Sequence, residues 1–263
     1  MFIPVAENLQ PFDLRAKELF NLNQSALERF LKDIESRGFK YIDLNPGPIR
    51  KDKEKIIRFF VEGINELSQL MFFIDSTDPE VFELVLKYSA RKPIINSFSL
   101  ERHKLINILP LAAKYDCDIV GLVMSDGFVP TSLEDKIIIA ENMLIEAEKA
   151  GVKKNQIILD PIIAPLGWEE GLRSNHANLR FIKGMRDIFG EELRFMVGLS
   201  NLTTRAAYGT NKSYFQNIFI SLLWQANIDF IMLDGFNNEV LKTVRFLSLL
   251  ESGGVFSFAE FSS

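Results

Sequence analysis

The stretch MFFIDSTDPEVFELVLKYS, residues 71–89, contains the pattern that decides the fold. An apolar run ends at Asp75, and after a short polar segment the apolar residues recur at the spacing of an α-helix. The pair Asp78-Pro79 is typical of a helix start, with Asp78 as the cap and Pro79 in the first turn. The stretch therefore predicts a buried strand followed by an amphipathic helix.

The same unit of a strand and a helix recurs along the whole chain. The seven other pairs occupy residues 2–7 and 25–38, 41–45 and 52–67, 93–98 and 101–115, 118–124 and 133–151, 157–162 and 178–190, 195–200 and 213–227, and 230–234 and 238–252. Continuously apolar strands between helices indicate a parallel sheet that is buried on both faces. Eight such units in 263 residues predict a closed (β/α)8 TIM barrel in a single domain spanning residues 1–263.

Two local features modify this pattern. Pro110 falls inside the fourth helical segment and is expected to kink or split it. The tail GGVFSFAEFSS, residues 253–263, is expected to seal the bottom of the barrel or to lie at an interface.

Composition excludes several classes of function. The net charge is -5 and no basic block is present, so we expect no nucleic-acid partner. Cys117 is the only cysteine, and the only histidines, His103 and His176, lack a metal-ligand spacing, so we expect no intrinsic metal. The start lacks the pattern of a signal peptide, and no run approaches the ~18 apolar residues of a membrane span. We therefore expect no membrane association and a cytoplasmic location.

Polar residues stand where the expected strands end, which in this fold is where ligands bind. Carboxylates and carboxamides dominate this set: Glu7, Asp43, Asn45, Asp75, Asn96, Met124, Asp160, Ser200, Asn201 and Asp234. Carboxylates accept hydrogen bonds, whereas carboxamides both donate and accept them. Because the set has no Lys, Arg or His, it favours a neutral ligand rich in N–H donors, such as the edge of a pterin, over a sugar phosphate.

Each of these residues also has a structural interpretation. An Asp after a strand is often a turn former or a helix cap, as expected for Asp234 before Gly235. For Asp75 the cap role is already filled by Asp78, and Asp160 precedes Pro161, which keeps it out of a helix. Asn96 and Asn201 could instead satisfy the backbone of loops.

Six motifs in order along the chain resemble one known family. They are YIDLNPGP at 41–48, FIDSTD at 73–78, IINSFSLER at 94–102, LPLAAKYDCDIVGLVM at 109–124, ILDPII at 158–163 and VGLSN at 197–201. Together they are similar to the methyltetrahydrofolate:corrinoid protein methyltransferases. These enzymes belong to the pterin-binding barrels, as do dihydropteroate synthase and the folate domain of cobalamin-dependent methionine synthase.

The resemblance implies a substrate, a partner and a set of site residues. Methyltetrahydrofolate would be the substrate, and a corrinoid protein, such as a corrinoid iron-sulfur protein, would supply the cobamide. Asp75, Asn96 and Asp160 would bind the polar edge of the pterin, and Asp43 and Asn45 would shape the pocket floor. Gly198 and Ser200 would lie against the ring, and Asn201 would approach N5, which bears the methyl group. The resemblance further implies a homodimer.

Two segments depart from the family pattern. The first strand reads AENLQ, residues 6–10, which keeps Glu7 but lacks the arginine that usually follows. The segment LTTRAAYGTNKS, residues 202–213, lacks the glutamine and the asparagine-arginine pair expected there. These departures favour an alternative, in which the barrel binds folate without catalysis or is a structural subunit of a corrinoid complex. Dihydropteroate synthase is a further alternative, although FIMLDGFNNEV at 230–240 lacks that enzyme's Lys-x-x-Arg-x-His signature.

Overall fold

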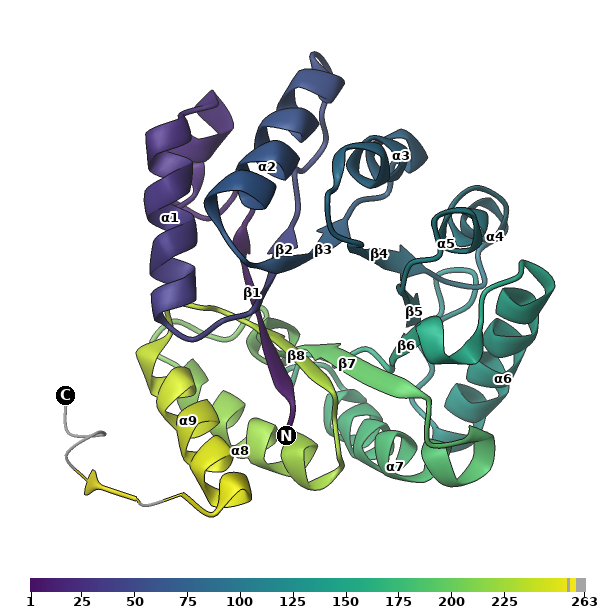
Figure 1. Cartoon of the computed structure of the whole chain (residues 1–263). Helices are drawn as coiled ribbons and strands as arrows, with labels where there is room; N and C mark the ends of the chain where they lie inside the picture. Colours follow the sequence, from purple (N-terminus) through teal and green to yellow (C-terminus); the bar gives the residue numbers. More distant parts are fainter. Residues whose placement is uncertain (255, 259–263) are drawn as a thin grey trace.

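The computed structural model describes residues 1–254 and 256–258 of the chain. Eight parallel strands close into a barrel in sequence order, with helices around the outside (Figure 1). The (β/α)8 fold expected from the sequence is therefore confirmed. Part of the tail that we expected to seal the barrel or form an interface lies outside the described residues.

The strands are four to seven residues long. They are β1 (Ile3–Leu9), β2 (Tyr41–Leu44), β3 (Met71–Asp75), β4 (Ile94–Phe98), β5 (Ile119–Leu122), β6 (Ile157–Asp160), β7 (Arg194–Gly198) and β8 (Phe230–Leu233). Each strand pairs with its sequence neighbours, and β8 closes the barrel by pairing with β1.

The helices run back along the outside of the barrel. They are α1 (Gln24–Ser36), α2 (Lys53–Leu67), α3 (Pro79–Tyr88), α4 (Arg102–Asn107), α5 (Leu109–Tyr115), α6 (Leu133–Lys149), α7 (Gly171–Phe189), α8 (Lys212–Gln225) and α9 (Asn238–Ser252), with short 3-10 helices η1 (Lys17–Asn21), η2 (Lys154–Gln156) and η3 (Leu199–Thr203). No helix of the described chain is long and apolar enough to cross a membrane.

Local sequence signals fix where several helices begin. The Asp78 side chain accepts a hydrogen bond from the backbone of Glu80, and Pro79 occupies the first turn of α3, as the sequence predicts. Pro110 lies at the start of α5 and separates it from α4, because proline cannot supply the N–H of a continuous helix. Asp75 is consequently not needed to cap α3.

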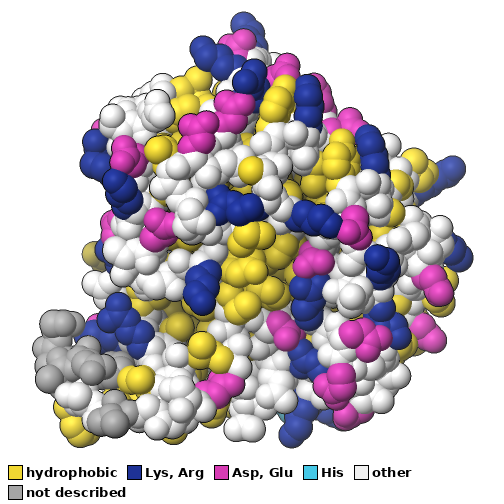
Figure 2. Space-filling model, in the orientation of Figure 1, with side chains coloured by type: hydrophobic (Ala, Val, Ile, Leu, Met, Phe, Trp, Pro, Cys, Tyr) yellow, Lys and Arg dark blue, Asp and Glu magenta, His cyan; other side chains and the backbone are white. Residues whose placement is uncertain are grey.

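The interior of the barrel is filled with apolar side chains. One buried cluster consists of Val5, Phe73, Ile94, Val120, Ile158, Met196, Phe230 and Met232, with Ile3, Tyr41 and Leu122 packed against it. The face that carries the N-terminus shows hydrophobic side chains at its centre, surrounded by charged ones (Figures 1 and 2). The barrel is therefore a packed core rather than a channel.

Candidate functional site at the carboxyl ends of the strands

The alternation of side chains along the strands builds the site. Successive residues of a strand point to opposite faces, so residues two apart share a face. In seven of the strands, the residue two positions after an interior apolar residue lies at or just past the strand end. These residues are Glu7, Asp43, Asp75, Asn96, Asp160, Gly198 and Asp234. The apolar cluster is thus the layer beneath these residues, and a largely polar layer follows it at the mouth of the barrel.

Asp75 and Asn96 lie side by side because they are register partners in neighbouring strands β3 and β4. Asn45 follows β2 and donates from Nδ2 to Asp75 Oδ2 at 2.8 Å. Asn96 Nδ2 lies 3.5 Å from Asp43 Oδ1, which is a long contact for a hydrogen bond. The structure therefore brings together four of the residues proposed from the sequence, on three adjacent strands.

Burial raises the pKa of the Asp43 carboxyl well above its usual range, and the neighbouring Asp75 raises it further. The pKa of Asp75 is also raised by burial, although its hydrogen bond from Asn45 and the charge of Lys104 oppose this. Two carboxyls this close resist being ionised together. The pair can therefore offer both a hydrogen-bond donor and acceptors to a ligand.

Asp160 ends β6 on the other side of the mouth and is 8% exposed. Its Oδ1 accepts a hydrogen bond from the backbone N–H of Ile162 at 2.7 Å. Burial raises the pKa of Asp160 to about 7, while this hydrogen bond and the nearby Lys136 ammonium act in the opposite direction. Within the described part of the chain, no residue hydrogen-bonds to Asp160 Oδ2, which is free to accept from a ligand.

Ser200 and Asn201 lie on η3, directly after β7. The Ser200 hydroxyl donates to Glu7 Oε2 at 2.9 Å, which ties η3 to β1. Asn201 is exposed, and its Nδ2 would lie 3.4 Å from a side chain added at Gly198. The Asn201 carboxamide therefore lies against Gly198 at the end of β7.

Burial raises the pKa of Glu7 to about 7, an effect that the Ser200 hydrogen bond partly offsets. From the sequence, Glu7 belongs to the polar strand-end residues but is given no role toward the ligand, and the arginine that usually follows it is missing. An arginine does reach this region from the loop after β1. Arg15 pairs with Asp13 at 2.8 Å and with Asp234 at 3.2 Å.

Asp234 is more than the simple turn former that we expected. Buried Asn8 donates to Asp13 at 2.7 Å and to Asp234 at 2.8 Å, and its Oδ1 accepts from the backbone of Gly235. Asn8 follows Glu7 in the unusual AENLQ segment, so this segment forms the network that joins β1 to the end of β8. The spacing of Asp13 and Arg15 within a loop gave no signal for this contact.

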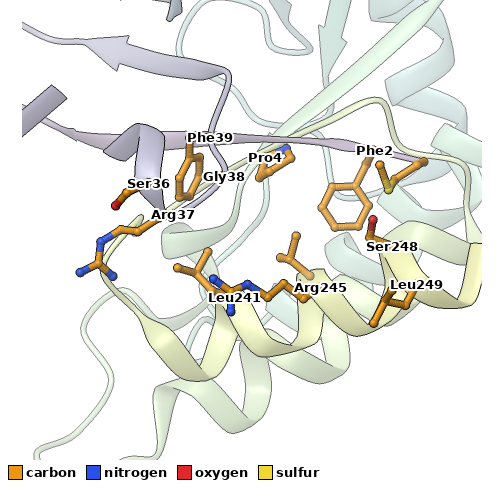
Figure 3. Close-up of a pocket in the computed structure, with 12 residues that line it drawn as sticks. Phe2, Pro4, Ser36, Arg37, Gly38, Phe39, Leu241, Arg245, Ser248 and Leu249 are labelled. Carbon is orange, nitrogen blue, oxygen red and sulfur yellow. The ribbon is translucent and has the colours of Figure 1, made fainter. Parts of the chain in front are cut away.

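A separate cavity of about 620 Å³ lies between α9, the start of β1 and the connection from α1 to β2 (Figure 3). Its lining includes the apolar residues Phe2, Phe39 and Leu241 and the charged residues Arg37 and Arg245. None of its 12 lining residues is Asp or Glu, so it lacks the carboxylate acceptors that the mouth of the barrel offers to an N–H-rich ligand. The mouth of the barrel is the better candidate site.

Among residues 1–254 and 256–258, no group of three or more His, Cys, Asp or Glu side chains is arranged to hold a metal ion. The buried carboxylic acids Asp43 and Asp160 and the partly buried Glu7 and Asp75 lie on four separate strands of the mouth.

The raised pKa values of Glu7 and Asp160 predict a pH dependence of stability without ligand. A raised pKa in the folded state contributes stability that is complete below the unfolded value, about 4, and that is lost as pH rises through about 7. The free energy of unfolding should therefore fall between pH 5.5 and 7.5, by on the order of 1 kcal/mol for each carboxyl. Denaturant titrations at these pH values measure it.

Asp160→Asn is the matched variant for this measurement, because it removes the titrating group with little change in shape. Its unfolding free energy should depend less on pH than that of the wild type. A wild type whose stability rises between pH 5.5 and 7.5 would contradict the assignment.

Comparison with known proteins agrees with this geometry. The family model of the pterin binding enzymes matches residues 19–217, which is most of the chain. The chain belongs to the pterin binding enzyme family. Among curated proteins, it is similar to the methylcorrinoid:tetrahydrofolate methyltransferase of Eubacterium limosum, with 26% identity over 226 residues, covering 82% of this chain and 80% of that protein. The resemblance to pterin-binding methyltransferases expected from the sequence is therefore confirmed.

Solved structures confirm the type of barrel. Dihydropteroate synthase from Stenotrophomonas maltophilia aligns with a TM-score of 0.69 at 15% identity, covering 97% of this chain and 94% of that one. Dihydropteroate synthase from Coxiella burnetii, solved in complex with pteroic acid, aligns with a TM-score of 0.67 at 12% identity, covering 95% of this chain and 93% of that one. At these identities the likeness establishes the fold alone.

Proposed function

We propose that this protein transfers a methyl group between N5 of tetrahydrofolate and the cobamide of a corrinoid protein. The observation that supports this most is the mouth layer, in which acceptor side chains from three sides surround an apolar floor. The name of the Eubacterium limosum relative describes a reaction of the same two classes of molecule.

The pterin edge is bound by Asp75, Asn96 and Asp160 in this proposal. The N–H groups of the edge face the carboxylates, while the Asn96 carboxamide can both donate and accept. Asn45 orients Asp75 through the 2.8 Å hydrogen bond, and Asp43 Oδ1 lies 3.5 Å from Asn96 Nδ2. The apolar side chains below this layer provide a surface for the flat ring.

Asn201 acts at N5, with Gly198 and Ser200 beside the ring. A neutral amine leaves a methyl carbon poorly, so N5 must gain a proton or a strong hydrogen bond as the bond to the methyl group breaks. A carboxamide can hydrogen-bond to N5 before and after the proton arrives, because its NH2 group donates and its oxygen accepts hydrogen bonds. Glu7, kept protonated up to about pH 7 by burial, can hold a proton near Ser200.

The cobamide of the partner protein supplies the cobalt that accepts or donates the methyl group. The residues of this chain bind and orient the folate and manage the proton at N5. From the sequence we expected transfer from methyltetrahydrofolate to the corrinoid, whereas the name of the relative gives the opposite direction for that protein. A site that stabilises one transition state accelerates both directions, so the same residues serve either.

A spectroscopic mixing assay tests the proposal. The protein is mixed with methyltetrahydrofolate and free cob(I)alamin, and separately with tetrahydrofolate and methylcob(III)alamin, in a buffer with chelator. A protein-dependent change of the visible spectrum in either direction is expected. Pterin binding by calorimetry without transfer in either direction would instead favour the alternative of a non-catalytic folate-binding barrel.

The homodimer implied by the resemblance is a further part of the proposal. Helix α8 exposes an apolar face made by Tyr214, Phe215, Ile218 and Leu222, each more than one third exposed. Contiguous apolar surface of this kind is typical of an interface. The wild type should be a dimer in light scattering at micromolar concentration, and Ile218→Lys should be a monomer.

Ile138→Lys on α6 is the control for that variant, because Ile138 is similarly exposed at 55% but lies on another helix. It should leave the dimer intact. A monomeric wild type would contradict this part of the proposal.

A further inference from the structure

Lys136 is the most unusual charged residue of the described chain. It lies on α6, is 0% exposed, and is the only lysine among the buried residues that the structure describes. Burial lowers its pKa to about 8, which the nearby Asp160 partly opposes. Removing an ammonium group from water is unfavourable unless other contacts offset it. An apolar side chain at this position would be enough to pack α6 against the barrel, so packing alone does not explain a lysine here.

The contacts of Lys136 point to the segment that follows Asp160. Its Nζ donates to the carbonyl oxygen of Pro161 at 3.0 Å. The next residue, Ile162, has a left-handed backbone with φ of 62°, which is rare and strained for a β-branched residue. Asp160 Oδ1 accepts from the backbone N–H of Ile162, and Asn178 on α7 donates to its carbonyl oxygen at 2.9 Å.

Asn175, also on α7, completes the hold on this segment. Its side chain accepts from the N–H of Ala164 at 2.9 Å and donates to the carbonyl oxygen of the same residue at 2.8 Å. Two helices therefore hold residues 161–164 in one conformation. Lys136 is the cationic member of this set, and among the described residues Asp160 and Lys136 are the charged groups that act on each other here.

We propose that Lys136 is a positioning residue for Asp160: its ammonium group fixes the backbone after Asp160 and supplies a positive charge that favours the ionised form of the Asp160 carboxylate, which a ligand needs. An ionised Asp160 offers acceptors to the N–H edge of a pterin. A protonated one would compete with that edge as a donor. The consequence for pterin affinity rests on the proposed function, whereas the effect on Asp160 itself does not.

The test removes the charge with two variants. Lys136→Met keeps the length and apolar character of the buried side chain, and Lys136→Gln retains a hydrogen-bond donor without the charge. The pKa of the Asp160 carboxyl is measured by carbon NMR in the ligand-free protein, with Asp160→Asn identifying the signal. In both variants the pKa of Asp160 should rise by about one unit, because the cation that lowers it is gone. Lys149→Met, an exposed lysine of the same helix, is the control and should leave it unchanged.

Pterin affinity is the second measurement. Calorimetry with methyltetrahydrofolate at several pH values should show about fivefold weaker binding by Lys136→Met near pH 7, because a rise of about one unit from a pKa of about 7 lowers the ionised fraction of Asp160 by that factor. Binding should recover at higher pH as Asp160 ionises. A purely structural role would weaken binding equally at every pH. In the Asp160→Asn background, Lys136→Met should have little further effect on affinity.

The two measurements separate the two proposals. An unchanged Asp160 pKa in both Lys136 variants overturns the role of Lys136, whether or not pterin binds. A wild type that binds no pterin overturns the proposed function, and the titration of Asp160 then still decides the role of Lys136. Weaker binding of equal size at all pH values would also overturn the positioning role.

Discussion

Asn201→Ala is expected to lower the rate of methyl transfer about 100-fold, as is typical for the loss of one hydrogen bond to a developing charge. The carboxamide is exposed at the mouth and folds towards Gly198, so its removal leaves the buried acceptors of the pterin edge in place. Affinity for methyltetrahydrofolate should therefore change little. Rapid mixing with saturating methyltetrahydrofolate and cob(I)alamin measures the single-turnover rate.

Asn211→Ala is the control, because Asn211 lies in the same connection between β7 and α8. Its side chain accepts from the backbone N–H of Tyr214 and caps α8. Its replacement should lower stability by about 1 kcal/mol without affecting the rate. An Asn201→Ala variant with an undiminished single-turnover rate would show that Asn201 only stabilises η3.

Asp75→Ala is expected to weaken pterin binding by about 1–3 kcal/mol, the cost of leaving buried ligand donors without an acceptor. The variant also frees the Asn45 carboxamide, which now donates to Asp75 at 2.8 Å. Stability should fall much less, because the lost carboxyl is itself held at a raised pKa by burial. Calorimetry with methyltetrahydrofolate measures the affinity, and thermal unfolding measures the stability.

Asp78→Ala provides a contrast only three residues away. Asp78 caps α3 and pairs with Lys53 at 2.6 Å, so its loss should cost about 1 kcal/mol of stability and leave pterin affinity unchanged. Equal affinity of the wild type and a folded Asp75→Ala variant would assign Asp75 a structural role instead.

The positions of the site residues could be predicted because the barrel turns sequence spacing into geometry. Each interior apolar residue of a strand predicts that the residue two places later faces the same interior, as Phe73 does for Asp75 and Ile158 for Asp160. Predicting these positions required only the ends of the strands and the alternation of side chains between the two faces of a strand. The break at Pro110 followed from the chemistry of one residue in the same way.

The supporting residues could not be predicted in this way. The segment DKIIIAENM of α6 contains three consecutive isoleucines, so its helical period does not single out one buried face. The structure buries Ile139, as hydrophobicity predicts, but it also buries Lys136 and leaves Ile138 55% exposed, which is the reverse of what hydrophobicity predicts for these two residues. Arg15 likewise meets Asp234 only because β8 closes against β1, a contact between residues 219 positions apart.

The packed floor of the barrel has a kinetic consequence for a methyl transfer at its mouth. Apolar side chains fill the interior below the carboxylates, so in the proposed reaction folate would enter and leave only through the end of the barrel that a corrinoid partner would also approach. Under this proposal, folate binds before the partner docks and does not exchange until the partner leaves. Turnover should follow an ordered sequence, and steady-state rates should decline when the partner is in large excess.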